Sequence, residues 1–320
     1  MADRKAQRAR TVLLLLALAT LVAAAAFLTV GARGPWGFVL ALRGGKLAGL
    51  VLVGAAIAVA TVLFQTLTEN RILTPAVMGF DALYVTVQSL AVLLLGAAGA
   101  SAIDPRLRFA GEALLLAVAA LALFRLLFDG RRGLHLVVLA GLVFGLLFRG
   151  LANLIQRLID PNAFAVLQGM LFARFNTMDT TLLPVAALII AAACLAALRL
   201  APVLDVLALG RERAINLGVD HARMVTALVL LVAVLVAVST ALAGPVLFFG
   251  LLVSNLAYLA LGTDRHLYTL PGAMLIAILC LAGGQTLLER GLGYDAALGM
   301  VIEFAGGIVF ILLLLRRTRA

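Results

Sequence analysis

Charge is scarce in this sequence. Only 12% of the 320 residues are charged and 64% are hydrophobic, whereas about a quarter of a soluble domain is charged. The only two cysteines, Cys194 and Cys280, lie in apolar stretches, so neither a disulfide framework nor a cysteine metal site is predicted. This composition excludes a soluble enzyme, a disordered chain and a nucleic-acid-binding domain. The pI near 10.9 instead indicates basic residues between membrane spans.

Motifs for catalysis are also missing. Neither a G-x-x-x-x-G-K-[ST] P-loop nor an H-E-x-x-H sequence occurs, so nucleotide hydrolysis and zinc proteolysis by this chain are not expected. The histidines His135, His221 and His266 lie far apart at predicted helix edges, and we interpret them as interfacial residues. We therefore expect no catalytic residue, no metal and no cofactor, and the protein is not predicted to be an enzyme.

Ten apolar stretches predict an all-α membrane protein with about ten transmembrane helices. They cover residues 11–30, 47–67, 75–98, 109–128, 134–155, 181–200, 224–243, 246–261, 268–288 and 297–315. Stretches this long, without the alternation of barrel strands, form helices because a helix satisfies its own backbone in lipid. The eighth stretch is short and follows Gly244-Pro245, which predicts a break. The first exceeds the roughly 15-residue core of a signal peptide, so a retained helix is expected.

Basic residues predict the orientation. With both ends on one side, that side carries 16 of the 25 Lys and Arg residues and the opposite side 9, so both termini are expected in the cytoplasm. The longest inner loop is residues 201–223. Pro202 is expected to end a helix there, with Asp205 as N-cap of a short helix 206–209 and a second helix at 211–217. Such a pair is typical either of a docking site for a soluble partner or of helices lying on lipid headgroups.

Few ionisable residues lie inside the predicted spans. Asp81 has two interpretations, a polar group on a pathway or a cap of the helix after Met78-Gly79, and Glu303 is interpreted as a packing residue. Because such groups are costly in lipid and no proton-relay array is present, an ion-coupled secondary transporter is the less favoured class. A structural scaffold is disfavoured by the helix break at 244–250, which is either part of a translocation path or a kinked hairpin.

Three segments carry family-like motifs. Residues 65–79 read QTLTENRILTPAVMG and resemble Q-x-x-T-x-N-x-L-x-x-P-x-x-x-G. Residues 209–219 resemble L-G-x-x-x-A-x-x-L-G-V, and residues 243–251 resemble A-G-P-I-x-F-V-G-L. In order and spacing the chain resembles the permease subunits of bacterial iron-chelate and cobalamin ABC importers, the FecCD-type family. The resemblance implies a cobalamin-importer-permease-like bundle, with 1–320 as one transmembrane permease domain in the bacterial inner membrane.

Short departures from the family pattern indicate a branch. Residues 254–258 read SNLAY where the family has P-H-x-x-R, and residues 294–299 read YDAALG in place of E-L-P-x-G. Together with GFDALY at 79–84, they resemble the branch that serves ferric siderophores, particularly catecholates. The implied function is half of a pore for an iron(III)-siderophore, powered by a separate ATPase. Cobalamin and haem remain alternative cargoes.

The resemblance also implies partners and sites. The partners are an ABC ATPase, a second permease (a non-identical paralogue or an identical copy), a periplasmic or lipoprotein substrate-binding protein and membrane lipid, without nucleic acid. The residues implied to couple to the ATPase are Leu209, Gly210, Arg211, Glu212, Arg213, Ala214, Leu217, Gly218 and Val219. The binding protein is expected to dock on Arg43, Lys46 and Arg290. The implied translocation path includes Gly244, Pro245, Phe248, Phe249 and Gly250.

Overall fold

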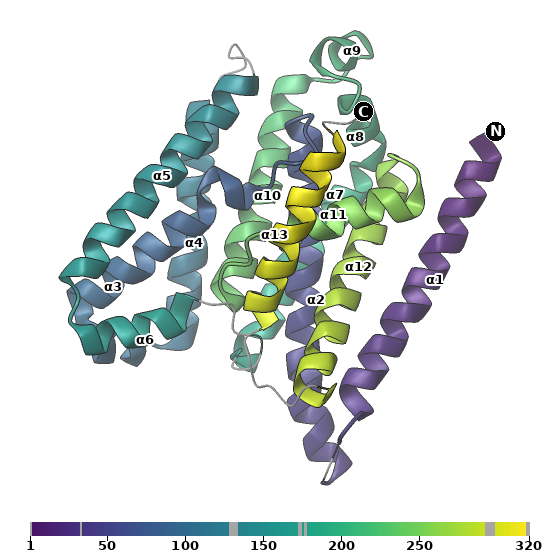
Figure 1. Cartoon of the computed structure of the whole chain (residues 1–320). Helices are drawn as coiled ribbons and strands as arrows, with labels where there is room; N and C mark the ends of the chain where they lie inside the picture. The colour runs from purple at the N-terminus through teal and green to yellow at the C-terminus, as the bar shows by residue number, and fades with distance from the viewer. Residues whose placement is uncertain are drawn as a thin grey trace.

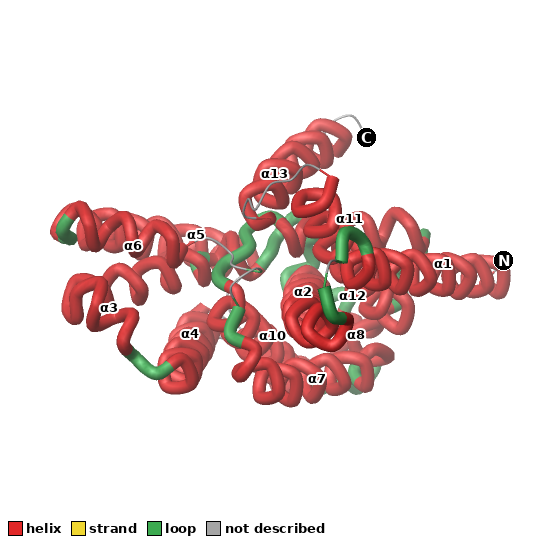
Figure 2. Tube along the Cα trace, turned by 90° about the horizontal axis from the view of Figure 1, so that it is seen from below, coloured by secondary structure: helices red, strands yellow, loops and turns green. Residues whose placement is uncertain are grey.

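The regular structure of the chain is helical throughout its described residues. In this computed structural model these are residues 2–32, 34–127, 134–171, 175, 178–291 and 298–317. The α-helices are α1 (Ala2–Thr29), α2 (Trp36–Leu67), α3 (Phe80–Ala102), α4 (Pro105–Leu127), α5 (Leu134–Leu158), α6 (Pro161–Leu171), α7 (Leu183–Arg199), α8 (Ala201–Leu207), α9 (Arg211–Asn216), α10 (His221–Ala243), α11 (Phe249–Leu261), α12 (His266–Thr286) and α13 (Leu298–Arg317). Short helical turns occur at η1 (Pro75–Met78), η2 (Thr180–Leu182) and η3 (Leu287–Gly291). The all-helical prediction is confirmed (Figures 1 and 2).

Seven helical segments of the described chain are long and apolar enough to cross a membrane. They are Ala6–Thr29, Trp36–Leu67, Phe80–Ala102, Leu139–Leu158, Thr180–Arg199, His221–Ala243 and His266–Arg290. The helix after the predicted break is short, because α11 has only 13 residues. Large apolar side chains are exposed along the outer helix faces, for example Leu14 at 72% and Leu188 at 74%. The chain is therefore a multi-pass membrane protein, since helices this long and apolar, with so many large apolar side chains exposed, are suited to lipid.

Helix α2 is the centre of the larger group of helices. It contacts α1, α7, α10, α11 and α12, and its second half is almost entirely buried. Small side chains permit this close packing. A Cβ atom added at Gly54 would lie 3.4 Å from the carbonyl carbon of Ala277 on α12. A central helix in contact with so many neighbours is suited to transmit a displacement from one end of the bundle to its middle.

Helices α3, α5 and α6 form a second group beside the first, and α4 connects them by packing on α10 (Figures 1 and 2). Met78 and Gly79, at the turn into α3, fit against Gly141 and Gly145 of α5. Gly79 has φ +96°, and a Cβ atom there would lie 2.6 Å from the Cα atom of Gly145. Only glycine adopts this conformation and this contact without strain.

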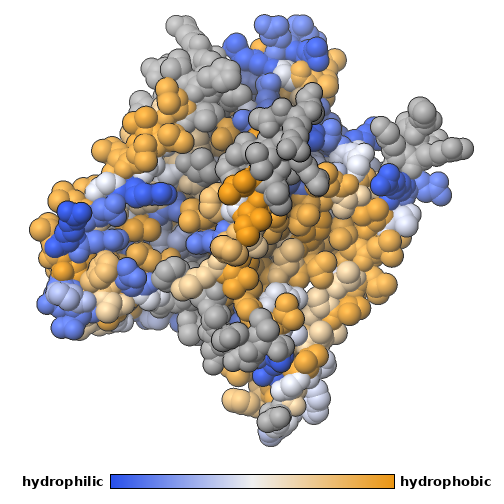
Figure 3. Space-filling model, viewed as in Figure 1, coloured by the Kyte–Doolittle hydropathy of each residue, from blue (hydrophilic) through white to orange (hydrophobic). Residues whose placement is uncertain are grey.

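The start of α1, the end of α13 and the pair α8–α9 lie at one end of the bundle, and α6 lies at the other (Figure 1). Hydrophilic side chains gather over α9, whereas hydrophobic ones cover the face over α12 and α1 (Figure 3). Of the two predicted short helices, the second, predicted at 211–217, is observed as α9 with nearly the same bounds. The first begins earlier than predicted, at Ala201, because Pro202 occupies its first turn, where the missing N–H costs nothing. Asp205 consequently lies inside α8 and is not its N-cap.

Candidate functional site

Helix α9 and the turns on either side of it display apolar and charged side chains together. The side chains of Leu209, Ile215 and Leu217 are 49%, 48% and 61% exposed, and Arg211, Glu212 and Arg213 are exposed beside them. Ala214 on the opposite face is fully buried and anchors the helix. Gly210 at φ +96° and Gly218 at φ +85° form the turns on either side. An exposed surface of this mixed composition is typical of a site for a protein partner.

A buried hydrogen-bond network lies beneath this surface. The Oδ1 atom of Asp205 on α8 accepts hydrogen bonds from the His266 backbone N–H at 2.8 Å and from its Nδ1 at 2.7 Å. The Nε2 atom of His266 lies 2.7 Å from Oγ1 of Thr66 on α2. His266 is 2% exposed, so its interpretation as an interfacial residue is wrong. The network joins α8 to the first residue of α12 and to the end of α2.

The proton positions follow from the partners. A carboxylate only accepts, so Nδ1 of His266 carries a proton toward Asp205. Thr66 Oγ1 also lies 2.9 Å from the carbonyl oxygen of Val62, to which it donates. In neutral His266 the Nε2 atom competes with Val62 for the single hydroxyl proton, whereas in the imidazolium Nε2 donates and both contacts are made. Sequence spacing carries no signal for this network, because His266 lies 61 and 200 residues from its two partners.

The segment that follows α2 is attached to α11. The side-chain amide of Gln65 donates to the carbonyl oxygen of Arg71 at 2.7 Å and to Oγ of Ser254 at 3.0 Å. Asn255 donates to the same carbonyl at 3.2 Å, and the Arg71 guanidinium lies 4.6 Å from the ring centroid of Tyr258. Ser254, Asn255 and Tyr258 are the residues that replace the P-H-x-x-R pattern. In this chain these residues attach α11 to α2 and to the segment that follows it.

This segment also reaches the α8–α9 turn. Glu69 has a positive φ of 48°, and a Cβ atom added at Gly210 would lie 3.8 Å from its Oε2. Arg71 forms an ion pair with Asp264 at 2.7 Å, but both side chains are more than half exposed, so the pair adds little stability. The exposed helix α9, the α8 network and the segment after α2 thus form one connected layer at this end of the bundle.

At the opposite end, Arg43 is 9% exposed. Its Nη1 atom donates to the carbonyl oxygens of Phe27, Leu28 and Val30 at 3.2, 3.0 and 2.9 Å. These groups close α1, where the last carbonyls lack partners within the helix. A cation at a helix C-terminus is also electrostatically favourable. The guanidinium therefore fixes the end of α1 against α2.

The other two basic residues of the implied docking site, Lys46 and Arg290, are more exposed than Arg43. Arg290 packs beside the turn after α1, since a Cβ atom on Gly31 would lie 3.2 Å from its Cδ. Its Nη2 atom lies 3.8 Å from Oε2 of Glu289. Lys46 is half-buried on α2. The structure thus brings Arg43 and Arg290 to the α1–α2 turn, with only Arg290 and Lys46 available to a partner.

The predicted break between α10 and α11 is present. Helix α10 ends at Ala243, Gly244 has φ +92°, and α11 begins at Phe249. Gly250 lies directly against the Thr61 hydroxyl of α2, and a Cβ atom on Gly306 of α13 would lie 2.6 Å from Cβ of Phe248. The break is therefore held between α2 and α13.

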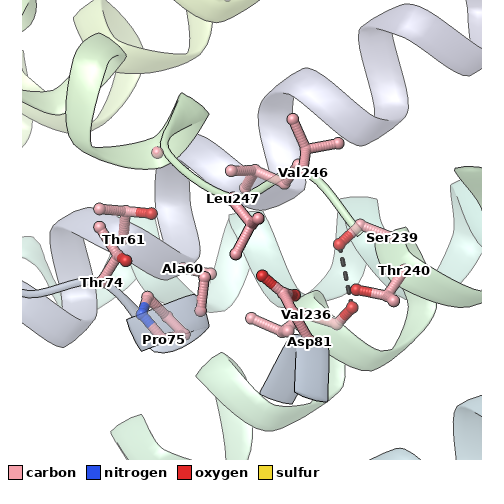
Figure 4. Close-up of a pocket in the computed structure, with 13 residues that line it drawn as sticks. Ala60, Thr61, Thr74, Pro75, Asp81, Val236, Ser239, Thr240, Val246 and Leu247 are labelled. Carbon is pink, nitrogen blue, oxygen red and sulfur yellow. Dashed lines mark hydrogen bonds between the residues drawn. The ribbon is translucent and has the colours of Figure 1, made fainter. Parts of the chain in front are cut away.

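A small cavity, partly open to its surroundings, adjoins this break (Figure 4). It is lined by Ile57, Ala60, Thr61, Thr74, Pro75, Ala76, Asp81, Val236, Ser239, Thr240, Val246, Leu247 and Gly250. Asp81 is 7% exposed, and its Oδ2 has no hydrogen-bond partner in the described chain. Asp81 thus lies in the first turn of α3 without that oxygen serving as a cap. Among the described residues, no group of three or more His, Cys, Asp or Glu residues is placed to hold a metal.

Comparison with known proteins identifies the family. The FecCD transport family matches residues 26–316. The chain is 42% identical over 288 residues to the petrobactin import system permease protein YclO of Bacillus subtilis, covering 90% of this chain and 91% of that protein. It is 32% identical over 280 residues to the ferric enterobactin transport system permease protein FepD of Escherichia coli, covering 85% and 80%.

A solved structure agrees in fold. An inward-facing metal-chelate type ABC transporter chain superposes with a TM-score of 0.83 at 21% identity, over 96% of this chain and 99% of that chain. At this identity the likeness establishes the fold alone. The family assignment depends on the sequence matches, which cover nearly the whole chain. This chain belongs to the FecCD transport family.

Proposed function

We propose that the chain is the transmembrane permease subunit of an ABC importer. It forms half of a pore that moves an iron(III)-siderophore across the bacterial inner membrane, with energy from a separate ATPase. The names of its relatives support this cargo, since they include permeases for petrobactin and ferric enterobactin. Relatives named for hemin and vitamin B12 transport are 25% and 30% identical, which makes haem and cobalamin the second candidates.

The proposed topology has ten spans within one permease domain, residues 1–320. Seven are the long apolar helices, and α4, α11 and α13 are the other three. The end that carries α1's start and α8–α9 is assigned to the cytoplasm, as the distribution of basic residues indicates. The same assignment places α6 and the α1–α2 turn on the outer side. A second permease subunit completes the pore, and the helix break at Gly244–Gly250 forms part of the path.

The observation that carries the proposal is the exposed surface of α9 above a buried network. The coupling residues Leu209, Gly210, Arg211, Glu212, Arg213, Ala214, Leu217, Gly218 and Val219 lie on α9 and its flanking turns. Displacement of α9 by the ATPase moves α8, and Asp205 transfers that motion through His266 to α12 and Thr66. Thr66 and Thr61 lie five positions apart on α2, and Thr61 rests on Gly250. Movement at the cytoplasmic end therefore reaches the helix break through one rigid helix.

The outer end is proposed to receive a substrate-binding protein. Lys46 and Arg290 offer positive charge to acidic residues of that partner, which steers and orients docking. Arg43 contributes by holding the end of α1 in place beneath them. Replacing both Lys46 and Arg290 by Glu is expected to weaken docking most at low salt, where exposed charges are least screened. Unchanged docking affinity at low salt would contradict this assignment.

The coupling surface is tested by Arg213→Glu. The charge reversal is expected to abolish co-purification of the ATPase subunit and ATP-dependent uptake. A partner surface that complements the positive charge of Arg213 would then face a negative charge in the middle of the docking surface. Arg10→Glu is the matched control, since Arg10 is also exposed at this end but lies on α1, away from α9 (Figure 1). Normal assembly and uptake in the Arg213 variant would contradict the assignment.

A further inference from the structure

Helix α5 carries an exposed charge in the middle of a membrane span. Arg149 is exposed and lies ten residues after the start and nine before the end of the span Leu139–Leu158. At about 1.5 Å per residue, roughly 14 Å of helix separates it from either end of the span. An arginine near a helix end extends its guanidinium to the membrane surface, but Arg149 is too deep to do so, and a charge that faces lipid is costly. Arg149 therefore lies on a side of α5 that does not face lipid.

The exposed surface of α5 divides into two stripes. Arg149, Asn153 and Arg157 follow one another at intervals of four residues and form the polar stripe. The leucine stripe has exposed fractions of 43–66% and consists of Leu147, Leu151, Leu154 and Leu158. At about 100° per residue, each of the first two leucines lies about 160° around the helix from the polar residue two positions after it. Lipid can cover the leucine stripe, so the polar stripe meets a different environment.

The rest of α5 is occupied by packing inside the chain. The helix contacts α3, α4 and η1. Ile155 and Ile159 lie in a buried cluster with side chains of α3 and α6. At the edge of this packed face, the side-chain amide of Gln156 donates to Oγ of Ser89 on α3 at 3.1 Å. The polar stripe thus lies between the side that packs on protein and the leucine stripe.

The positive charges of the polar stripe are open to a partner. In the described chain no acidic side chain forms an ion pair with Arg149 or Arg157. Asp81 acts on Arg149 electrostatically, but it lies in the cavity beside the helix break. Helices α5 and α13 lie on the same side of the molecule, the side turned to the viewer in Figure 1 (Figures 1 and 2). Hydrophilic side chains interrupt the hydrophobic surface over α5 on this side (Figure 3).

We propose that the polar stripe lines a water-filled part of the translocation path and that Arg149 binds an anionic iron chelate there. Charged residues within spans face such cavities and mark substrate pathways. Iron(III) chelates of catecholate and carboxylate groups are anions, because the ionised oxygens around the metal outweigh its charge. In the proposed topology the stripe runs inward from Arg157 at the outer end of α5, so its field attracts an anion into the path. The inference rests on the proposed function and adds the charge of the cargo.

Thiol labelling of the assembled importer tests the electrostatic part of the proposal. Asn153→Cys is introduced together with Cys194→Ala and Cys280→Ala, and its reaction rates with an anionic and a cationic methanethiosulfonate reagent are compared. Adding Arg149→Gln is expected to lower the ratio of the anionic to the cationic rate about tenfold, because a unit charge about 6 Å away acts oppositely on the two reagents. An unchanged ratio contradicts the proposal.

The same reagents test whether the polar stripe meets water. Leu151→Cys is the matched control, because it lies at a similar depth on the leucine stripe. Asn153→Cys is expected to react with both charged reagents and Leu151→Cys with neither. An Asn153→Cys variant that fails to react overturns the proposal, because the stripe is then covered by the second permease or by lipid.

Uptake of iron(III)-petrobactin into proteoliposomes with the complete importer tests the cargo part. Arg149→Gln is expected to lower uptake about tenfold through the loss of one unit charge beside the anion, and Arg149→Lys to retain most of it. Arg106→Gln, which alters an exposed arginine in the first turn of α4, is expected to leave uptake unchanged. Equal uptake by Arg149→Gln and the parent contradicts the inference and leaves the proposed function intact. A parent importer without uptake contradicts the proposed function, and the labelling ratio then decides on the stripe.

Discussion

Replacing Gly79 by alanine tests the close contact between the turn into α3 and helix α5. Gly79 has φ +96° in the left-handed region. An added Cβ atom would lie 2.6 Å from the Cα and 2.9 Å from the N atom of Gly145. Both neighbours are backbone atoms, so no flexible side chain is available to move aside. The two helices must separate by about 0.8 Å to restore the ordinary contact distance of 3.4 Å.

The stability that Gly79→Ala is expected to lose has two parts. A left-handed conformation costs a residue with a Cβ atom about 1–2 kcal/mol. Forcing an extra carbon into a packed contact costs about 1–3 kcal/mol more. Gly262 provides a matched control, because it is also left-handed, at φ +61°, but an added Cβ atom has nothing within 4 Å. Gly79→Ala is therefore expected to lose about 1–3 kcal/mol more stability than Gly262→Ala, or roughly 5- to 150-fold in the unfolding equilibrium constant.

The assay is equilibrium unfolding of both variants by SDS titration in mixed micelles, followed by helical circular dichroism. Transport by the Gly79 variant, measured beside it, is expected to fall because α5 is displaced from the turn into α3. Equal losses of stability in the two variants would refute the reasoning, since the steric term would then be absent.

Three further predictions concern other contacts. Asp205→Ala should cost about 1–2 kcal/mol and uncouple ATP hydrolysis from transport while the ATPase still binds; full coupling would contradict the role of the His266 network. Arg43→Met should cost about 1–3 kcal/mol because three carbonyls lose their donor, and unfolding titrations measure it; an unchanged midpoint would contradict the role. Hydrogen bonds from the side chain and backbone of Thr181 hold the pKa of Asp179 below its ordinary value. The ionised Asp179 carboxylate therefore stabilises the fold fully at a pH above its ordinary pKa, and this stabilisation is lost as the pH falls through the lowered pKa. Asp179→Ala should remove this part of the acid dependence of unfolding. An acid-unfolding profile identical to that of the parent would contradict the prediction.

Features set by local composition were predictable from the sequence. Long apolar stretches predict the spans because lipid permits few alternatives to a helix. The break at Gly244-Pro245 and the helix at 211–217 follow from residues that interrupt or bound helices wherever they occur. The first short helix begins at Ala201 and not at 206, because Pro202 both prevents one helix from continuing and favours the first turn of the next.

Features set by distant contacts were not predictable. His266 resembles an interfacial histidine until α8 and α2 are placed beside it. Arg43 counts as an outer positive charge in the sequence, whereas its guanidinium turns toward the carbonyl groups at the end of α1. For Asp81 the sequence left two interpretations open, and the structure contradicts the cap, because no side-chain hydrogen bond caps the start of α3. The segment 294–297, part of the branch pattern, lies outside the described residues.

The most direct test of the proposed function is uptake by proteoliposomes that contain this chain with the proposed second permease, ATPase and binding protein. Iron(III)-petrobactin is the first substrate to test, because two relatives are named for its import. Uptake is expected to require ATP and every subunit, and to cease with Arg213→Glu but not with Arg10→Glu. Uptake that persists without the ATPase and collapses when an ion gradient is dissipated would contradict the account.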